Sequence, residues 1–98
     1  MIVLLKEIFM NKEAKDARMR AIGEKFRRLR KEAGYKNYDH LAYDLNISRN
    51  QISRIERGEN ITMDTLLLML DAYGMSLSEF FAEFEENKEA GLERMKSS

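Results

Sequence analysis

The feature that most constrains this chain is a pair of short helical patterns separated by a very short turn. Asn37 can cap a first helix over residues 38–45, and Ser48, with a glutamine three residues further on, has the spacing of a capping box that opens a second helix. Asn46 lies between them and tolerates the left-handed conformation that a tight turn requires. The pattern therefore predicts two helices held at a fixed angle by a tight turn.

Three further helices are predicted around the same core. The first begins at about Lys12 and ends at Gly34. The fourth covers residues 63–73 after a Thr62 cap, and a capping box at Ser76 opens the fifth. We therefore predict an all-α, five-helix domain. Its expected inward residues are Ile22, Phe26, Leu29, Ala33, Leu41, Ala42, Leu45, Ile52, Ile55, Leu66, Leu67, Leu70, Leu77, Phe80, Phe81 and Phe84.

Length and composition fit one such domain. The chain has 98 residues, of which 44% are hydrophobic, and this suffices for a single core. It has no cysteine, which excludes disulfides, zinc–thiolate sites and cysteine nucleophiles, and no proline to interrupt its helices. We predict an N-terminal extension over 1–20, the helical domain over 21–85 and an acidic, frayed tail over 86–98.

The extension begins with an apolar run from Met1 to Met10. The run is too short to span a membrane, and it lacks the basic lead and cleavage site of a signal peptide. We interpret the extension as an accessory helix or strand that packs on the domain or on a dimer partner, as a disordered leader, or as sequence upstream of a natural start at Met10. Packing is the interpretation that we favour.

Charge is distributed unevenly along the chain, although the formal net charge is zero. Residues 1–58 carry a net charge of +6 and residues 59–98 a net charge of −6. The basic part can face a polyanion while the acidic part stays in solvent or contacts another protein. An ordinary mixed surface is the alternative interpretation.

The helix expected over about 48–57 has an outward face suited to reading bases. Arginine can donate to guanine O6 and N7 together, and asparagine or glutamine can pair in the same way with adenine N6 and N7. A generic solvated helix would use Glu and Lys, whereas the one acidic residue here, Glu56, is expected to face inward. The outward residues are Arg49, Asn50, Ser53, Arg54 and Arg57, with Gln51 beside them.

Residues 22–81 resemble the Cro/cI phage-repressor type of helix-turn-helix domain, also called the XRE family. The resemblance implies a five-helix phage-repressor-like fold and a sequence-specific transcriptional regulator that binds the major groove of double-stranded DNA as a homodimer. The residues that carry it are Ile22-Gly23-Glu24, Leu29-Arg30, Leu41-Ala42, the run from Ile47 to Gly58, the run from Leu66 to Leu70 and the run from Gly74 to Phe81.

The resemblance also implies roles for particular residues. It makes Arg30 and Glu56 a partly buried ion pair that ties the first helix to the third. It places Arg49, Asn50 and Arg54 at base-reading positions. Contacts with the DNA backbone are expected from Tyr38, Gln51, Ser53 and Arg57, and from the basic face of the first helix at Lys25, Arg27 and Arg28.

The sequence departs from the family pattern at several positions. Tyr38 stands where a phosphate-contacting glutamine is usual, and Asp39 beside it would be repelled by DNA. Asn46 replaces a usual glycine. Glu59 and Asn60 stand where basic residues are common, which implies modest affinity or dependence on the basic N-terminal segment.

No pattern in the sequence indicates an enzyme, because nucleophile–base pairs, carboxylate dyads, glycine-rich phosphate loops and metal clusters are not visible. His40 is expected to be an exposed residue of the second helix. We expect no cofactor, metal, small-molecule ligand or membrane association, and a cytoplasmic location. Phe80, Phe81 and Phe84 are expected to belong chiefly to the core, but three phenylalanines in five residues exceed what one short helix needs to bury, which predicts a dimer interface at Phe81 and Phe84. The alternative function is an antitoxin or adaptor whose aromatic and acidic C-terminal helix holds a partner protein, such as a toxin.

Overall fold

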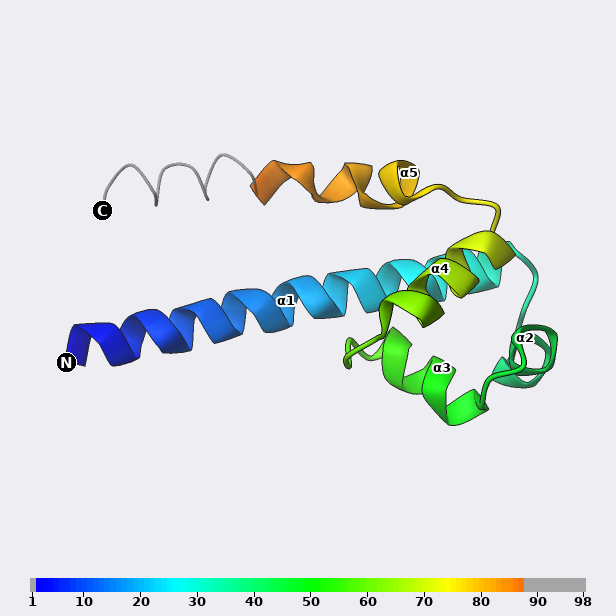
Figure 1. The fold of residues 1–98 in the computed structure, drawn as a ribbon, viewed down its shortest axis with the longest axis horizontal. Helices are drawn as coiled ribbons and strands as arrows, with labels where there is room; N and C mark the ends of the chain where they lie inside the picture. Colours follow the sequence, from blue (N-terminus) through cyan, green and yellow to red (C-terminus); the bar gives the residue numbers. More distant parts are fainter. Residues whose placement is uncertain (1, 88–98) are drawn as a thin grey trace.

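A long N-terminal helix carries the rest of the fold (Figure 1). The computed structural model describes the backbone of residues 2–87 and the side chains of residues 12–84, and α1 occupies Ile2–Glu32. The helix start predicted near Lys12 is therefore wrong. Between Ile2 and Glu32 there is no proline and one glycine, so no residue stops the helix before Lys12. Within the described residues, no helix combines the length and the hydropathy needed to cross a bilayer.

The other helices are short, and each α-helix begins at a polar cap, as predicted. The side chains of Asn37, Ser48, Thr62 and Ser76 each accept a hydrogen bond from a backbone N–H in the first turn of the helix that follows. At Ser76 the capping box with Glu79 is complete. The elements are α2 (Tyr38–Leu45), α3 (Arg49–Glu56), α4 (Met63–Ala72), α5 (Leu77–Phe81) and the 3₁₀ helix η1 (Ala82–Asn87).

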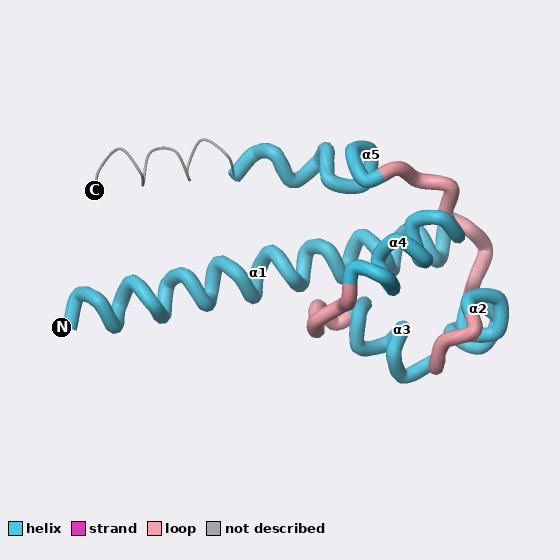
Figure 2. The backbone as a smooth tube through the Cα atoms, in the orientation of Figure 1, coloured by secondary structure: helices cyan, strands magenta, loops and turns pink. Residues whose placement is uncertain are grey.

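Helices α3 and α4 pack against the C-terminal half of α1, α2 packs against α3 and α4, and α5 with η1 then runs back along α1 (Figures 1 and 2). Asn46 adopts φ 55° and ψ 44° in the turn between α2 and α3, as its residue type predicted. The frayed tail predicted over 86–98 lies, from residue 88 onward, outside the described residues.

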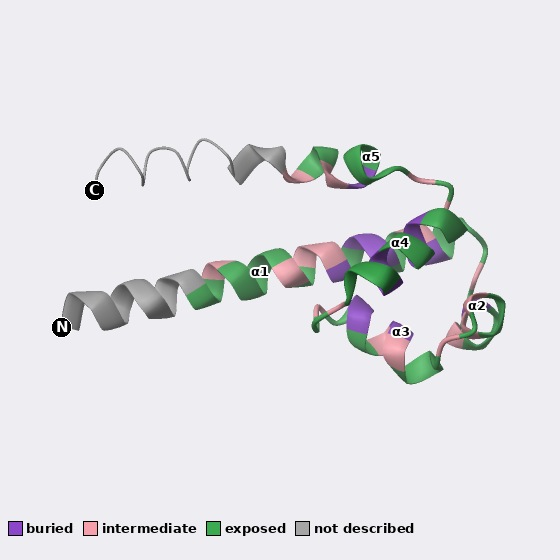
Figure 3. Ribbon diagram, in the orientation of Figure 1, coloured by how far each residue is buried: buried purple, intermediate pink, exposed green. Residues whose placement is uncertain are grey.

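The core forms where α1, α3, α4 and α5 meet, and Figure 3 shows the buried residues concentrated there. Phe26 and Phe80 are fully buried at its centre, with ring centroids 4.7 Å apart. Three predicted inward residues are exposed instead: Ala33, which follows the end of α1, Leu67 and Leu77. Met69 takes the inward position on α4, because the apolar face follows the helical spacing of residues 66, 69 and 70.

Candidate nucleic-acid interface

One face of α3 is buried and the other is open to solvent. Ile52 and Ile55 are buried against the neighbouring helices, and the Ser48 side chain holds the first turn by accepting from the Gln51 N–H at 3.1 Å. The helical repeat then turns Arg49, Asn50 and the other predicted base-facing positions to the outside. The predicted inward and outward faces of α3 are therefore both observed.

The C-terminal end of α3 lies directly against α1. Gly23 makes this approach possible: a Cβ at this position would lie 2.6 Å from the Ile55 carbonyl oxygen and 2.7 Å from that of Glu56. Gly58, at φ 87°, ends α3 and lies close to the backbone of Arg20. Since backbone meets backbone at this contact, α1 sets the position of α3 with little freedom.

A buried ion pair provides the second contact between these helices. Arg30 Nε donates to Glu56 Oε2 at 2.7 Å and Arg30 Nη2 donates to Glu56 Oε1 at 3.2 Å, with the two side chains 5% and 3% exposed. Arg30 Nη1 also donates to the Tyr35 carbonyl oxygen at 2.6 Å. The hydrogen bond to Glu56 raises the pKa of Arg30, although burial opposes this effect. The pair implied by the resemblance is thus present, and it is buried more deeply than expected.

Tyr38 packs against the arginine of this buried pair. Its ring lies under the Arg30 guanidinium, with Cζ 4.7 Å from the ring centroid, and the residue is half-buried. Tyr38 therefore has a packing role at the start of α2, besides the contact with the DNA backbone that was predicted for it.

The three arginines of the outward face are extended into solvent, and carboxylates outside α3 lie beside all of them. Arg49 Nε is 3.4 Å from Asp39 Oδ1 at the start of α2. Arg54 Nε donates to Glu59 Oε1 at 3.4 Å, and Arg57 Nη2 is 3.0 Å from Glu59 Oε2. Sequence reasoning treated both acids only as departures from the family pattern, although their nearness to the arginines along the chain could have indicated these contacts.

Gln51 and Ser53 are less available than the arginines, since both are half-buried. Gln51 Nε2 donates to Thr65 Oγ1 on α4 at 3.3 Å. The glutamine side chain thus turns toward α4, whereas the predicted capping box would turn it back toward Ser48. Thr65 is buried and also joins the Thr62 cap, which makes a polar contact here more favourable than one in solvent.

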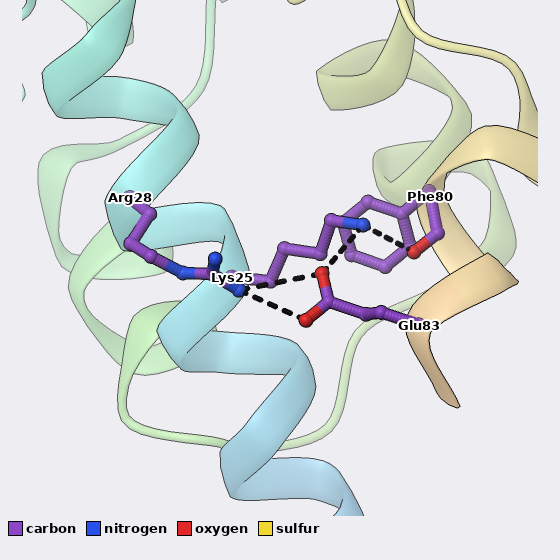
Figure 4. A network of polar contacts seen from close by, with 4 residues as sticks. All are labelled: Lys25, Arg28, Phe80 and Glu83. Atoms are coloured by element: carbon purple, nitrogen blue, oxygen red, sulfur yellow. Dashed lines mark hydrogen bonds and ion pairs between the residues drawn. The ribbon is translucent and has the colours of Figure 1, made fainter. Parts of the chain in front are cut away.

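The prediction that Lys25 lies on an exposed basic face of α1 is wrong. Its side chain is buried, and Nζ donates to the Phe80 carbonyl oxygen at 2.5 Å and pairs with Glu83 Oε1 at 2.7 Å (Figure 4). The Phe80 carbonyl lies in α5 two residues before η1 begins, so the lysine ammonium group contacts the backbone at the junction of the two helices. Lys25 therefore ties α5 to α1 and is removed from the expected phosphate contacts.

Arg27 and Arg28 remain at the surface of α1. Arg28 Nη2 pairs with Glu83 Oε2 at 3.2 Å, so Glu83 contacts two cations of α1 (Figure 4). The hydrogen bond from Lys25 is the main cause that lowers the pKa of Glu83. The contacts of Glu83 were not predicted from the sequence, because its partners lie more than fifty residues earlier.

The aromatic residues of the C-terminal segment lie on the core. Phe80 is fully buried, whereas Phe81 and Phe84 are half-buried and pack against the core cluster. The two residues predicted as a dimer interface thus keep part of their surface in solvent. His40 is exposed on α2, and the described side chains include no group of three or more His, Cys, Asp or Glu residues that could hold a metal ion.

The comparisons with known proteins agree with this geometry. A family model described as helix-turn-helix matches residues 26–80, from the C-terminal part of α1 to the buried phenylalanine of α5. The chain belongs to the Cro/cI-type, or XRE, helix-turn-helix family of DNA-binding domains. Neither the search of curated proteins nor the search of solved structures gave a match.

Proposed function

We propose that this protein is a sequence-specific transcriptional regulator that inserts α3 into the major groove of DNA. The observation that carries the proposal is the outward face of α3, where Arg49, Asn50 and Arg54 are exposed on a capped helix. Gly23 and the Arg30–Glu56 pair fix that helix on α1. In the proposal these three side chains read bases, with arginine directed at guanine and asparagine at adenine.

Contacts with the phosphate backbone position the helix and carry no sequence information of their own. We assign them to Ser53 on α3 and Arg57 at its C-terminal cap, to Arg27 and Arg28 on α1 and to the Tyr38 hydroxyl group. Lys25 is left out because it is buried against Phe80, and Gln51 because its amide donates to Thr65.

A homodimer would place two copies of α3 in successive major grooves about 34 Å apart. The half-buried faces of Phe81 and Phe84 are the proposed contact between protomers, because together they leave apolar surface in solvent. Sedimentation equilibrium of the wild type and of Phe84→Ser tests this contact, and an unchanged molar mass would contradict it.

The reading role of Arg54 is tested by selecting binding sites from a random duplex pool. We expect Arg54→Ala to relax base preference at one position by about 1–3 kcal/mol, since one bidentate contact is lost. Arg27→Ala is the matched control, because the loss of one phosphate contact weakens all sequences alike and lowers the salt slope by about one. Equal enrichment by the wild type and Arg54→Ala would contradict base reading by this residue.

A further inference from the structure

The acidic residue that follows α3 is held in place by the helix itself. The Glu59 N–H donates to the Arg54 carbonyl oxygen at 3.0 Å, across the turn that Gly58 makes at φ 87°. This backbone hydrogen bond fixes the position of the Glu59 Cα atom, from which the side chain extends, relative to Arg54. The carboxylate then contacts both Arg54 Nε at 3.4 Å and Arg57 Nη2 at 3.0 Å, one oxygen to each.

We propose that Glu59 is a positioning residue that determines the base specificity of Arg54, an inference that rests on the proposed function. Arginine has five N–H donors in a planar fork. Glu59 occupies the Nε side of the Arg54 fork, so the two terminal amino groups are the ones left to address guanine O6 and N7. The same carboxylate holds Arg57 beside it.

Without the Glu59 contact, the Arg54 side chain has room for a different orientation. A hollow of about 260 Å³ lies beside it, between the end of α3 and the start of α4, and Arg54 and Glu59 both line it. Its other walls are partly polar and partly apolar and include Gln51, Asn60 and Ile61. A long, flexible side chain with this space beside it needs a fixed partner to stay in one orientation.

Besides raising the preference for one base pair, Glu59 lowers the affinity for DNA of any sequence. A carboxylate near the groove is repelled by phosphates, so it weakens binding to every DNA sequence. Glu59 therefore lowers affinity in general and raises the preference for the correct site. Asp39 has the same relation to Arg49, since it meets Nε at 3.4 Å from the start of α2.

The experiment measures the dissociation constants of the full chain by fluorescence anisotropy on three duplexes. These are the site selected from the random pool, that site with the Arg54-dependent base pair exchanged, and a scrambled duplex. We expect Glu59→Gln to bind the scrambled duplex more tightly than the wild type does. We also expect its preference for the selected site over the exchanged site to fall about tenfold, because an amide has one acceptor oxygen where the carboxylate has two.

Two further variants separate positioning from charge. Glu59→Asp keeps the carboxylate and should recover part of the preference. Asp71→Asn, an exposed position at the C-terminal end of α4, makes the same change in net charge and should leave the preference unchanged. In the Arg54→Ala background, Glu59→Gln should have no effect on the preference. Thermal unfolding of each variant shows that the fold is retained.

The outcomes distinguish the two claims. If Glu59→Gln binds all three duplexes more tightly by the same factor, Glu59 acts by repulsion alone and the inference is overturned, while the proposed function stands. If the wild type selects no sequence from the pool, the proposed function fails, and the inference fails with it.

Discussion

Arg30–Glu56 and Arg54–Glu59 join the same two chemical groups at sites of very different exposure. The first pair has side chains 5% and 3% exposed and a shortest contact of 2.7 Å, whereas the second has side chains 64% and 47% exposed and a contact of 3.4 Å. Without water, a charge that loses its partner cannot be resolvated, so the buried pair is structural. In water the contact contributes little to stability, so the exposed arginine remains available to another partner.

Lys25–Glu83 lies between these extremes, with side chains 9% and 44% exposed. The three pairs form a series in which burial decreases while the charges stay similar. Removing one carboxylate at a time should therefore show how burial alone scales the contribution of an ion pair to stability.

The largest loss is expected for Glu56→Ala. It leaves the Arg30 guanidinium buried without its carboxylate, and the free energy of unfolding should fall by about 3–5 kcal/mol in chemical denaturation. The double variant Arg30→Met, Glu56→Leu is the control, because an apolar pair of similar volume should recover much of this loss. A loss below about 1 kcal/mol in Glu56→Ala would mean that burial does not govern this pair.

An intermediate loss is expected for Glu83→Gln, about 0.5–1 kcal/mol at neutral pH, because Lys25 keeps its bond to the Phe80 carbonyl oxygen. The folded protein lowers the pKa of Glu83, so its contribution is complete above the usual glutamate value of about 4.3 and is lost as pH falls through the folded value. The stability gap between wild type and variant should therefore close below this pH. A gap that widens on acidification would contradict the assignment.

The smallest loss is expected for Glu59→Gln, less than about 0.5 kcal/mol, because both members of the Arg54–Glu59 pair are exposed. Urea titrations at low and high salt provide the measurement, and the small difference should shrink further as salt screens the pair. A loss as large as that of Glu83→Gln would break the proposed order.

Local signals allowed much of the fold to be predicted. The caps at Asn37, Ser48, Thr62 and Ser76 act within one helical turn, and the left-handed conformation of Asn46 follows from its own side chain. Ile52 and Ile55 fixed the inward side of α3, and with it the outward arginines. These features depend on residues only a few positions apart in the chain, so they can be predicted from one sequence.

Contacts between distant segments could not be predicted in the same way. Lys25 lies three residues after Ile22 and four before Leu29, at the edge of the buried stripe of α1, yet its burial depends on where α5 ends. On α4 a run of leucines fits more than one helical face, and packing selected Met69 over Leu67. Gly23 was part of the resemblance, but the carbonyl groups that it meets are visible only in the folded chain.

Gly23 and Arg30 also set the register of α1. They are seven residues apart, close to two full turns, so both face α3 from the same side of the helix. Inserting or deleting one residue between them would rotate Gly23 by about 100° relative to Arg30 around the helix axis. The Gly23 contact and the Arg30–Glu56 ion pair could then not form together. Changes in length before Arg20, which lies against Gly58, would change only the part of α1 that precedes these contacts. The seven-residue interval is thus a part of α1 whose length the fold cannot vary.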